Sequence, residues 1–221
     1  VEIPIPTLLR AWRIRSWREK LEPGSLRAGI GIWAFLARRP GLYGLASRIE
    51  TLPQQFGERR SRYLRDLKLN VSGVLNSSNM TKKETSLLAL SVVVNEKNDV
   101  LIAAFTAMAT REGATADEIA ETHACASIMG VNNIFYRYRH YMHDNEYYNK
   151  TPAGLRMSVM MNPAMGKPLF ELMSLVVSAV NGCERCVVSH EHSVKEQGAS
   201  EPRIYDAIRL AAVIKGLSTV I

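Results

Sequence analysis

The sequence predicts an all-α protein, and three observations lead to that fold class. Apolar residues recur three and four positions apart along nearly the whole chain, which is the period of a helix that buries one face. Runs in which Val, Ile or Thr alternate with polar residues, the pattern typical of strands, are scarce. Helix start and stop signals bound several of the periodic segments. With 221 residues, 47% of them hydrophobic, the chain can bury a sizeable core in one or two domains.

Ten helices are expected from the periodicity, and three of them carry clear start signals. Thr81 with Glu84 resembles a capping box, in which the two side chains bond each other's backbone amides. Thr115 precedes an acidic first turn, and Ser200 precedes a proline in the first turn. The expected helices run roughly over residues 5–20, 25–38, 41–65, 81–94, 97–112, 116–130, 132–143, 168–180, 183–197 and 201–217.

An internal repeat relates two stretches of the chain at an offset of 85 residues. Gly113 and Gly198, which are both expected to end helices, stand at this offset. Other matching pairs are Leu87 with Leu172, Leu90 with Leu175, Val92 with Val177, Ala114 with Ala199, Ile119 with Ile204, and Ala126 with Ala211. We therefore expect one helical unit used twice, over residues near 87–130 and near 172–215.

Residues 1–46 differ in composition from residues 47–221, and we expect them to form a separate basic helical extension. They hold three Trp and many Arg, with turn signals at Pro23-Gly24 and Pro40-Gly41. The net charge of +7 has its whole excess near the N-terminus, since residues 1–68 contain 14 Lys and Arg against 6 Asp and Glu. Such a segment is compatible with docking on an anionic surface or a partner, and a helical arm packed on its own domain is the alternative.

Neither export nor a membrane span is expected. No uncharged apolar stretch reaches about 18 residues, and the first residues lack the pattern of a secretory signal. An odd number of cysteines, three, does not fit an extracellular disulfide scaffold. A reducing cytoplasm is therefore the expected location. Cys125 stands among small residues and is expected to pack in the core.

Cys183 and Cys186 form a Cys-x-x-Cys motif, a spacing used for redox work or as half of a metal site. His190 follows four residues later, so the three side chains share one face of a helix. A free thiol has a pKa of about 8.5 and reacts as its thiolate, which an adjacent base or cation promotes. We expect His190 to take the proton, and Arg185 with the helix start to stabilise the anion.

Glu171 lies in an otherwise apolar helix, where a carboxylate is costly to bury without a partner. We expect it to orient His190 or to relay a proton. The alternatives are a zinc half-site with His190 or His192 as third ligand, a core histidine, and a surface carboxylate. No second Cys pair follows, and structural zinc usually takes four protein ligands, so no metal is expected. The other histidines are interpreted as ordinary polar residues: His123, His140, His143 and His192.

The reactive set belongs to the second copy of the repeat only. In the first copy, the positions equivalent to the two cysteines and to the histidine are Asn98, Leu101 and Phe105. Apolar residues can therefore occupy two of these three places. Because packing alone does not demand Cys and His there, the second copy is the one expected to carry function.

A family resemblance rests on these residues and their spacing. The run Asn181-Gly182-Cys183-x-x-Cys186-x-x-x-His190-Glu191-His192, preceded by Phe170-Glu171-Leu172, resembles the alkyl hydroperoxidase D (AhpD) family. Residues 66–70, 128–137 and 154–157 are also similar, and the resemblance covers about residues 47–221. It implies the all-α fold of the AhpD and carboxymuconolactone decarboxylase superfamily, a homotrimer, and work in peroxide defence.

The resemblance also implies a path for electrons. They would pass from dihydrolipoamide, on a lipoyl-bearing 2-oxoacid dehydrogenase component, to an AhpC-type peroxiredoxin, with weak peroxidase activity on organic hydroperoxides and no bound cofactor. Cys186 would be the thiolate activated through His190 and Glu171, and Cys183 the more accessible partner that closes the disulfide. Where some members have a His between the cysteines this chain has Arg185, whose charge can lower a thiol pKa.

Two other functions stay open, and nucleic acid is not an expected partner in any of them. A lactone decarboxylase that works without cysteines shares the superfamily fold, although the reactive dithiol argues against it. A binding protein acting through residues 1–46 would show salt-sensitive binding that survives loss of both cysteines.

Overall fold

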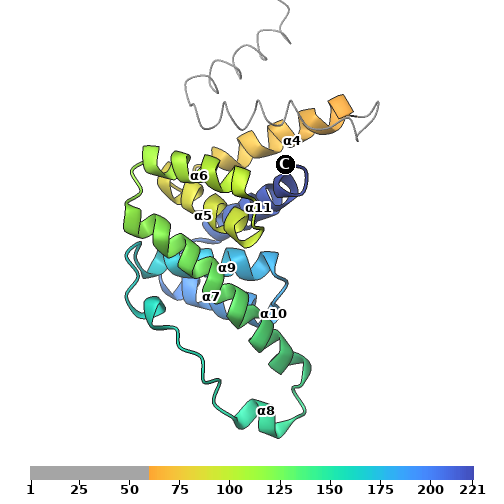
Figure 1. Ribbon diagram of the computed structural model, residues 1–221, viewed down its shortest axis with the longest axis vertical. Helices are drawn as coiled ribbons and strands as arrows, with labels where there is room; N and C mark the ends of the chain where they lie inside the picture. Colours follow the sequence, from red (N-terminus) through yellow and green to blue (C-terminus); the bar gives the residue numbers. More distant parts are fainter. Residues whose placement is uncertain (1–59) are drawn as a thin grey trace, which may run out of the picture. The chain divides into compact units, whose positions relative to one another are not determined.

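The computed structural model describes residues 60–221, and every regular element in that range is helical, as the periodicity predicts (Figure 1). The expected extension over residues 1–46 and its boundary lie outside the described residues and stay predictions. No helix of residues 60–221 combines the length and the apolarity that crossing a lipid bilayer requires. The elements are α4 (Arg60–Leu75), α5 (Lys82–Asn95), α6 (Asp99–Arg111), α7 (Ala116–Tyr141), α8 (Glu146–Lys150), the 3-10 helix η2 (Ser158–Met161), α9 (Lys167–Val180), α10 (Glu184–Glu196) and α11 (Glu201–Ser218).

The helix start signals are confirmed at three positions. Thr81 caps α5 in a full capping box, and Thr115 caps α7 in the same way. Ser200 caps α11 by accepting a hydrogen bond from the amide of Arg203. These caps satisfy amide groups that a helix leaves without a partner in its first turn, so the helices begin within one or two residues of their expected starts.

Two expected helix boundaries are wrong. The helices expected over 116–130 and 132–143 are one continuous helix, α7, because Gly130 permits a turn without requiring one. The helix expected to end near residue 65 runs on to Leu75, because Leu67, Val71 and Leu75 continue the buried face. The short elements α8 and η2 were not expected. None of their residues is buried, so no apolar period marks them, and α8 projects from the bundle in Figure 1.

The centre of the bundle is made by α5 and α9. Both are buried on nearly all sides, which a helix tolerates only when it is apolar all round. α5 packs against α6, α7, α9 and α11, and α9 packs against α5, α7, α10 and α11. Each fully buried Leu or Val on these helices contributes about 1.5–3 kcal/mol relative to its exposed state. The site described below is held by this rigid pair.

Helix starts recur at the offset of the expected repeat. α5 and α9 begin at Lys82 and Lys167, α6 and α10 at Asp99 and Glu184, and α7 and α11 at Ala116 and Glu201. This equal spacing supports the internal repeat, which itself stays a prediction.

Candidate active site

The Cys-x-x-Cys motif stands at the turn from α9 into α10. Gly182 follows the end of α9 with a φ of 67°, a left-handed conformation that glycine adopts at little cost. Cys183 is the N-cap of α10, and Cys186 lies in its first turn. The two cysteines form a disulfide with their Cα atoms 5.3 Å apart. The spacing thus places both sulfur atoms at the positive end of a helix dipole, where an anion is stabilised.

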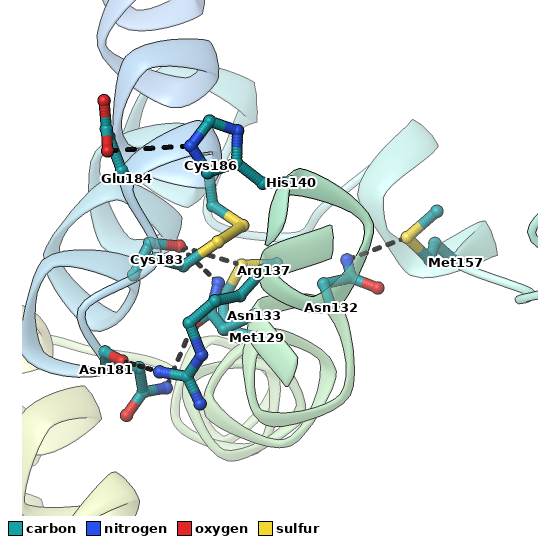
Figure 2. Close-up of a disulfide and its surroundings, with 11 residues drawn as sticks. Met129, Asn132, Asn133, Arg137, His140, Met157, Asn181, Cys183, Glu184 and Cys186 are labelled. Carbon is teal, nitrogen blue, oxygen red and sulfur yellow. Dashed lines mark hydrogen bonds and ion pairs between the residues drawn. A yellow bond between two sulfur atoms is a disulfide. The ribbon is translucent and has the colours of Figure 1, made fainter. Parts of the chain in front are cut away.

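The expected order of cysteine accessibility is wrong in this disulfide form. Cys183 is 0% exposed, whereas Cys186 is 7% exposed. Cys183 sits where the chain leaves the buried α9, and Figure 2 shows Met129, Asn133 and Arg137 of α7 beside it. Cys186 lies farther along α10, a helix with only two buried residues. Both cysteines are buried, and the small exposed part of the disulfide belongs to Cys186.

The expected contact between Glu171 and His190 is present. Nδ1 of His190 on α10 lies 2.7 Å from Oε2 of Glu171 on α9, and the two side chains are 14% and 10% exposed. An ionised carboxylate can only accept, so Nδ1 donates its hydrogen and the lone pair of the imidazole is on Nε2. The pair is one turn along α10 from Cys186, on the same face. The arrangement presents a held imidazole base near the sulfur atoms.

Asparagine side chains tie the Cys-x-x-Cys turn to two other helices, and Figure 2 shows the link to α7. Asn181 and Asn95 of α5 exchange two side-chain hydrogen bonds of 2.9 and 3.1 Å. Asn181 also donates to Asn133 of α7 at 2.9 Å, and Asn133 donates to Ser178 at 2.9 Å. Arg137 of α7 donates to the backbone carbonyl of Asn181 at 2.7 Å. These largely half-buried bonds hold the backbone just before Cys183 in one place.

Sequence reasoning missed these supporting residues and the position of His140. Nε2 of His140 on α7 lies 3.7 Å from a carboxylate oxygen of Glu184, the residue after Cys183 (Figure 2). Residues 128–137 entered the sequence argument through the family resemblance alone. No spacing along the chain predicts that Asn133, Arg137 and His140 meet the turn between α9 and α10.

Cys125 is a free thiol in the core, as expected. Burial raises its pKa to about 12, and the nearby carboxylates of Glu171 and Glu121 add to that rise, while a hydrogen bond with Ser174 opposes it. A thiol of this kind stays protonated and unreactive at neutral pH. It takes no part in the site.

The zinc alternative finds no ligand set in residues 60–221. Within that range, no three or more His, Cys, Asp or Glu side chains are grouped in a way that can hold a metal ion. His192 instead pairs with Glu196 on the surface of α10, at 3.2 Å.

Comparison with known proteins gives consistent relatives. Residues 147–220 match the model described as "Carboxymuconolactone decarboxylase family". A protein named alkyl hydroperoxide reductase AhpD from Anaeromyxobacter dehalogenans (strain 2CP-C) is 42% identical over 150 residues, covering 68% of this chain and 80% of that protein. The AhpD of Coxiella burnetii (strain RSA 493) is 39% identical over 172 residues, covering 76% and 95%. The AhpD of Rhodospirillum centenum is 39% identical over 159 residues, covering 72% and 84%.

Proposed function

This chain belongs to the AhpD family of the carboxymuconolactone decarboxylase superfamily, and on that premise we propose that it is a thiol-disulfide oxidoreductase with alkyl hydroperoxide reductase activity. One observation carries the proposal: the Cys183–Cys186 disulfide stands at a helix start beside the buried pair of His190 and Glu171. Two thiols within bonding reach and a base to activate one of them are what such a reaction needs.

In the reduced enzyme, Cys186 is the attacking thiolate. His190 Nε2 takes its proton, and Glu171 stabilises the imidazolium that results. The sulfur attacks the terminal oxygen of the hydroperoxide, so that an S–O bond forms and the O–O bond breaks. The alcohol leaves with the proton from His190, and Cys186 becomes a sulfenic acid. The thiol of Cys183 then displaces water from that sulfur, and the disulfide closes.

Dihydrolipoamide is the reductant we propose, carried by a 2-oxoacid dehydrogenase component. One of its thiolates attacks the more exposed sulfur, that of Cys186, and Cys183 leaves as a thiolate. The start of α10 favours that anion. The second thiol of the donor then closes the lipoamide ring and frees Cys186. An AhpC-type peroxiredoxin or an organic hydroperoxide accepts the electrons, and a reducing cytoplasm is the location that suits this cycle.

We propose a homotrimer as the working assembly, and the exposed surface of α7 supports self-association. Val131, Ile134, Tyr138 and Tyr141 are all exposed, and their spacing of three and four residues puts them on one face of the helix. Light scattering of the full chain should give the mass of a trimer, and Tyr141→Glu should lower that mass. A monomeric wild-type protein would contradict this part of the proposal.

The deciding experiment is lipoamide-dependent hydroperoxide reduction by the full chain and by Cys183→Ser and Cys186→Ser. Each substitution should lower the rate by about three orders of magnitude, because serine supplies neither the thiolate nor the resolving sulfur. Cys125→Ser is the matched control and should keep the activity. Activity that survives loss of both cysteines would overturn the proposal.

That overturning result would favour the second candidate, a decarboxylase that works without cysteines. The description of the matching family model names such an activity. The two cysteines lie inside the matched residues, and the relatives given above all carry the name alkyl hydroperoxide reductase, so the dithiol function is preferred. Binding through residues 1–46 lies outside the described residues and stays a prediction.

A further inference from the structure

A cavity of about 530 Å³ lies next to the Cys-x-x-Cys turn. Its lining comes from the end of α5, the turn after α5, one face of α7, and Asn181. Asn181 stands two residues before Cys183, and Arg137 both lines the cavity and bonds the carbonyl of Asn181. Figure 2 shows the Arg137 side chain extending to Asn181. A ligand in the cavity is therefore a neighbour of the backbone that leads into the Cys-x-x-Cys turn, and neither cysteine is among the lining residues.

The cavity carries positive charge that no acidic residue of the described chain neutralises. Lys97 and Arg137 line it, and its lining among residues 60–221 includes no Asp or Glu. In that same range neither Lys97 nor Arg137 forms an ion pair with a carboxylate. Cations left unpaired in a concave surface attract anions more strongly than the same cations on an open one.

Lys97 occupies a backbone position that suits glycine. Its φ of 56° is left-handed, and Gly182 has the same role at the end of α9, with a φ of 67°. Holding a lysine in this conformation costs on the order of 1 kcal/mol relative to glycine. The turn itself does not require the long side chain. A charge at the cavity is a reason for its presence.

Gly130 lies in the interior of α7 and also lines the cavity. No heavy atom stands within 4 Å of the place where a Cβ would be, and its φ is not left-handed. Glycine inside a helix costs about 0.5–1 kcal/mol relative to alanine. Since neither packing nor backbone conformation demands glycine here, its effect is to leave the cavity open.

We propose that this cavity binds aliphatic carboxylates, and that the preferred hydroperoxides of the enzyme carry a carboxylate on an aliphatic chain. The unpaired cations hold the carboxylate, and Val94 and Ala126 line the cavity with apolar surface for the chain. The statement about substrate rests on the proposed function, whereas the statement about binding stands without it. Reduction consumes both thiol hydrogens and yields the hydroxy acid, water and the disulfide.

The binding test titrates octanoate into the full-length disulfide form and measures heat, with octanamide as the neutral match. Octanoate should bind about tenfold or more tightly than octanamide, because only the acid pairs with the cations. Lys97→Gly should weaken octanoate binding by a similar factor, and Gly130→Leu should abolish it by filling the space. Equal affinity for acid and amide, or undiminished binding by Gly130→Leu, would overturn the proposal.

Two matched variants control for unrelated effects. Gly73→Leu fills a helical position on α4 that also has no heavy atom within 4 Å of a Cβ, and it lies outside the cavity. Lys167→Gln removes one positive charge at the start of α9, also outside the lining. Both should bind octanoate as the wild type does. If Lys167→Gln lowers the affinity as much as Lys97→Gly, the effect is one of net charge and the site assignment fails.

The kinetic test compares a hydroperoxide of an aliphatic acid with the methyl ester of the same compound. The reduced enzyme should show a kcat/KM about tenfold higher for the acid, and Lys97→Gly should bring the two values together. If neither compound is reduced, the proposed function fails, and the octanoate titration still decides the binding site. If both are reduced at equal rates by the wild type, the function stands and the substrate assignment fails.

Discussion

Two turns of this chain share one backbone conformation and differ in chemistry: the turn from α5 to α6 and the turn from α9 to α10. Each helix ends at a left-handed residue, Lys97 or Gly182. Each next residue caps the following helix, with φ −94° and ψ 93° at Asn98, and φ −94° and ψ 90° at Cys183. Matching backbone hydrogen bonds close both turns. The backbone conformation of the turn from α9 to α10 is therefore shared by a turn that holds no cysteines.

The side chains on that backbone make the difference. Asn98 accepts a hydrogen bond from an amide of α6 at 3.0 Å and so acts as an ordinary cap. Cys183 makes no such bond and is joined to Cys186 instead. Seven residues after each cap, Phe105 is buried in the core, whereas His190 contacts the carboxylate of Glu171 on α9. The proposed redox site thus differs from an ordinary turn in its side chains, and each prediction below tests that comparison.

The largest effect is expected when the second turn receives the side chains of the first. The quadruple variant Glu171→Ser, Cys183→Asn, Cys186→Leu and His190→Phe should fold, because the first copy of the repeat holds these residue types, Ser86 included, and no buried carboxylate is left without a partner. Its hydroperoxide reduction should fall by about three orders of magnitude or more. Circular dichroism melting and the lipoamide-coupled assay measure the two halves of this expectation. An unfolded variant would show that the exchanged residues hold the structure as well.

A smaller loss is expected when the charge behind the base is removed. Glu171→Gln keeps the size of the side chain but loses the carboxylate that stabilises a protonated His190, and the rate should fall by about 10²-fold at neutral pH. The deficit should shrink as the pH approaches about 8.5, where an ordinary thiol ionises without help. A pH profile parallel to that of the wild type would mean that Glu171 acts only in packing.

The left-handed positions should respond in opposite directions. Gly182→Ala places a Cβ in a conformation that disfavours it and should lower the free energy of unfolding by about 1–2 kcal/mol. Lys97→Gly relieves the same strain and should raise it by up to about 1 kcal/mol. Urea denaturation of the full chain measures both. Equal signs for the two changes would show that the turns are not equivalent.

The smallest effect is expected on stability at acid pH, where the N-terminus of α5, which has a side-chain cap, should behave differently from that of α9, which has none. Burial raises the pKa of Glu84, but hydrogen bonds from Arg203 and Thr81 outweigh it and hold that pKa below its ordinary value of 4.5. The stabilisation is therefore present above about pH 4.5 and is lost as the pH falls through the lowered value. Glu84→Gln should flatten the acid side of the stability curve. The start of α9 has no side-chain cap to titrate.

The fold could be predicted where neighbouring residues in the sequence determine the helix, through a capping residue or a repeating apolar face. The capping residues Thr81 and Thr115 mark helix starts by their own chemistry. The break expected at Gly130 was wrong because glycine lowers helix stability without ending a helix that is packed on both sides of it. The exposed helix α8 has no apolar period to detect.

The contacts of the candidate site could be predicted because Cys183, Cys186 and His190 are spaced at helical intervals, and their reactivity stays a prediction. The contact of Glu171 with His190 followed from the cost of burying a lone carboxylate. The residues from α7 could not be found in this way, since Arg137 and Asn133 reach the turn through packing of helices far apart in sequence. The exposure of Cys183 also depends on packing against α7, which is why the expectation that Cys183 is more accessible than Cys186 was wrong.

The buried thiol of Cys125 can serve as an internal probe of how often the core opens. Cys125 is wholly enclosed between α7 and α9, and its raised pKa keeps it protonated. An alkylating reagent can mark it only after those helices separate, so its labelling rate counts opening events of the core. In the folded protein Cys125 does not react, so every thiol that a reagent detects in residues 60–221 belongs to Cys183 or Cys186. A mass spectrum of one labelled sample would then report the redox state of Cys183 and Cys186 on one peptide and the opening of the core, through Cys125, on another.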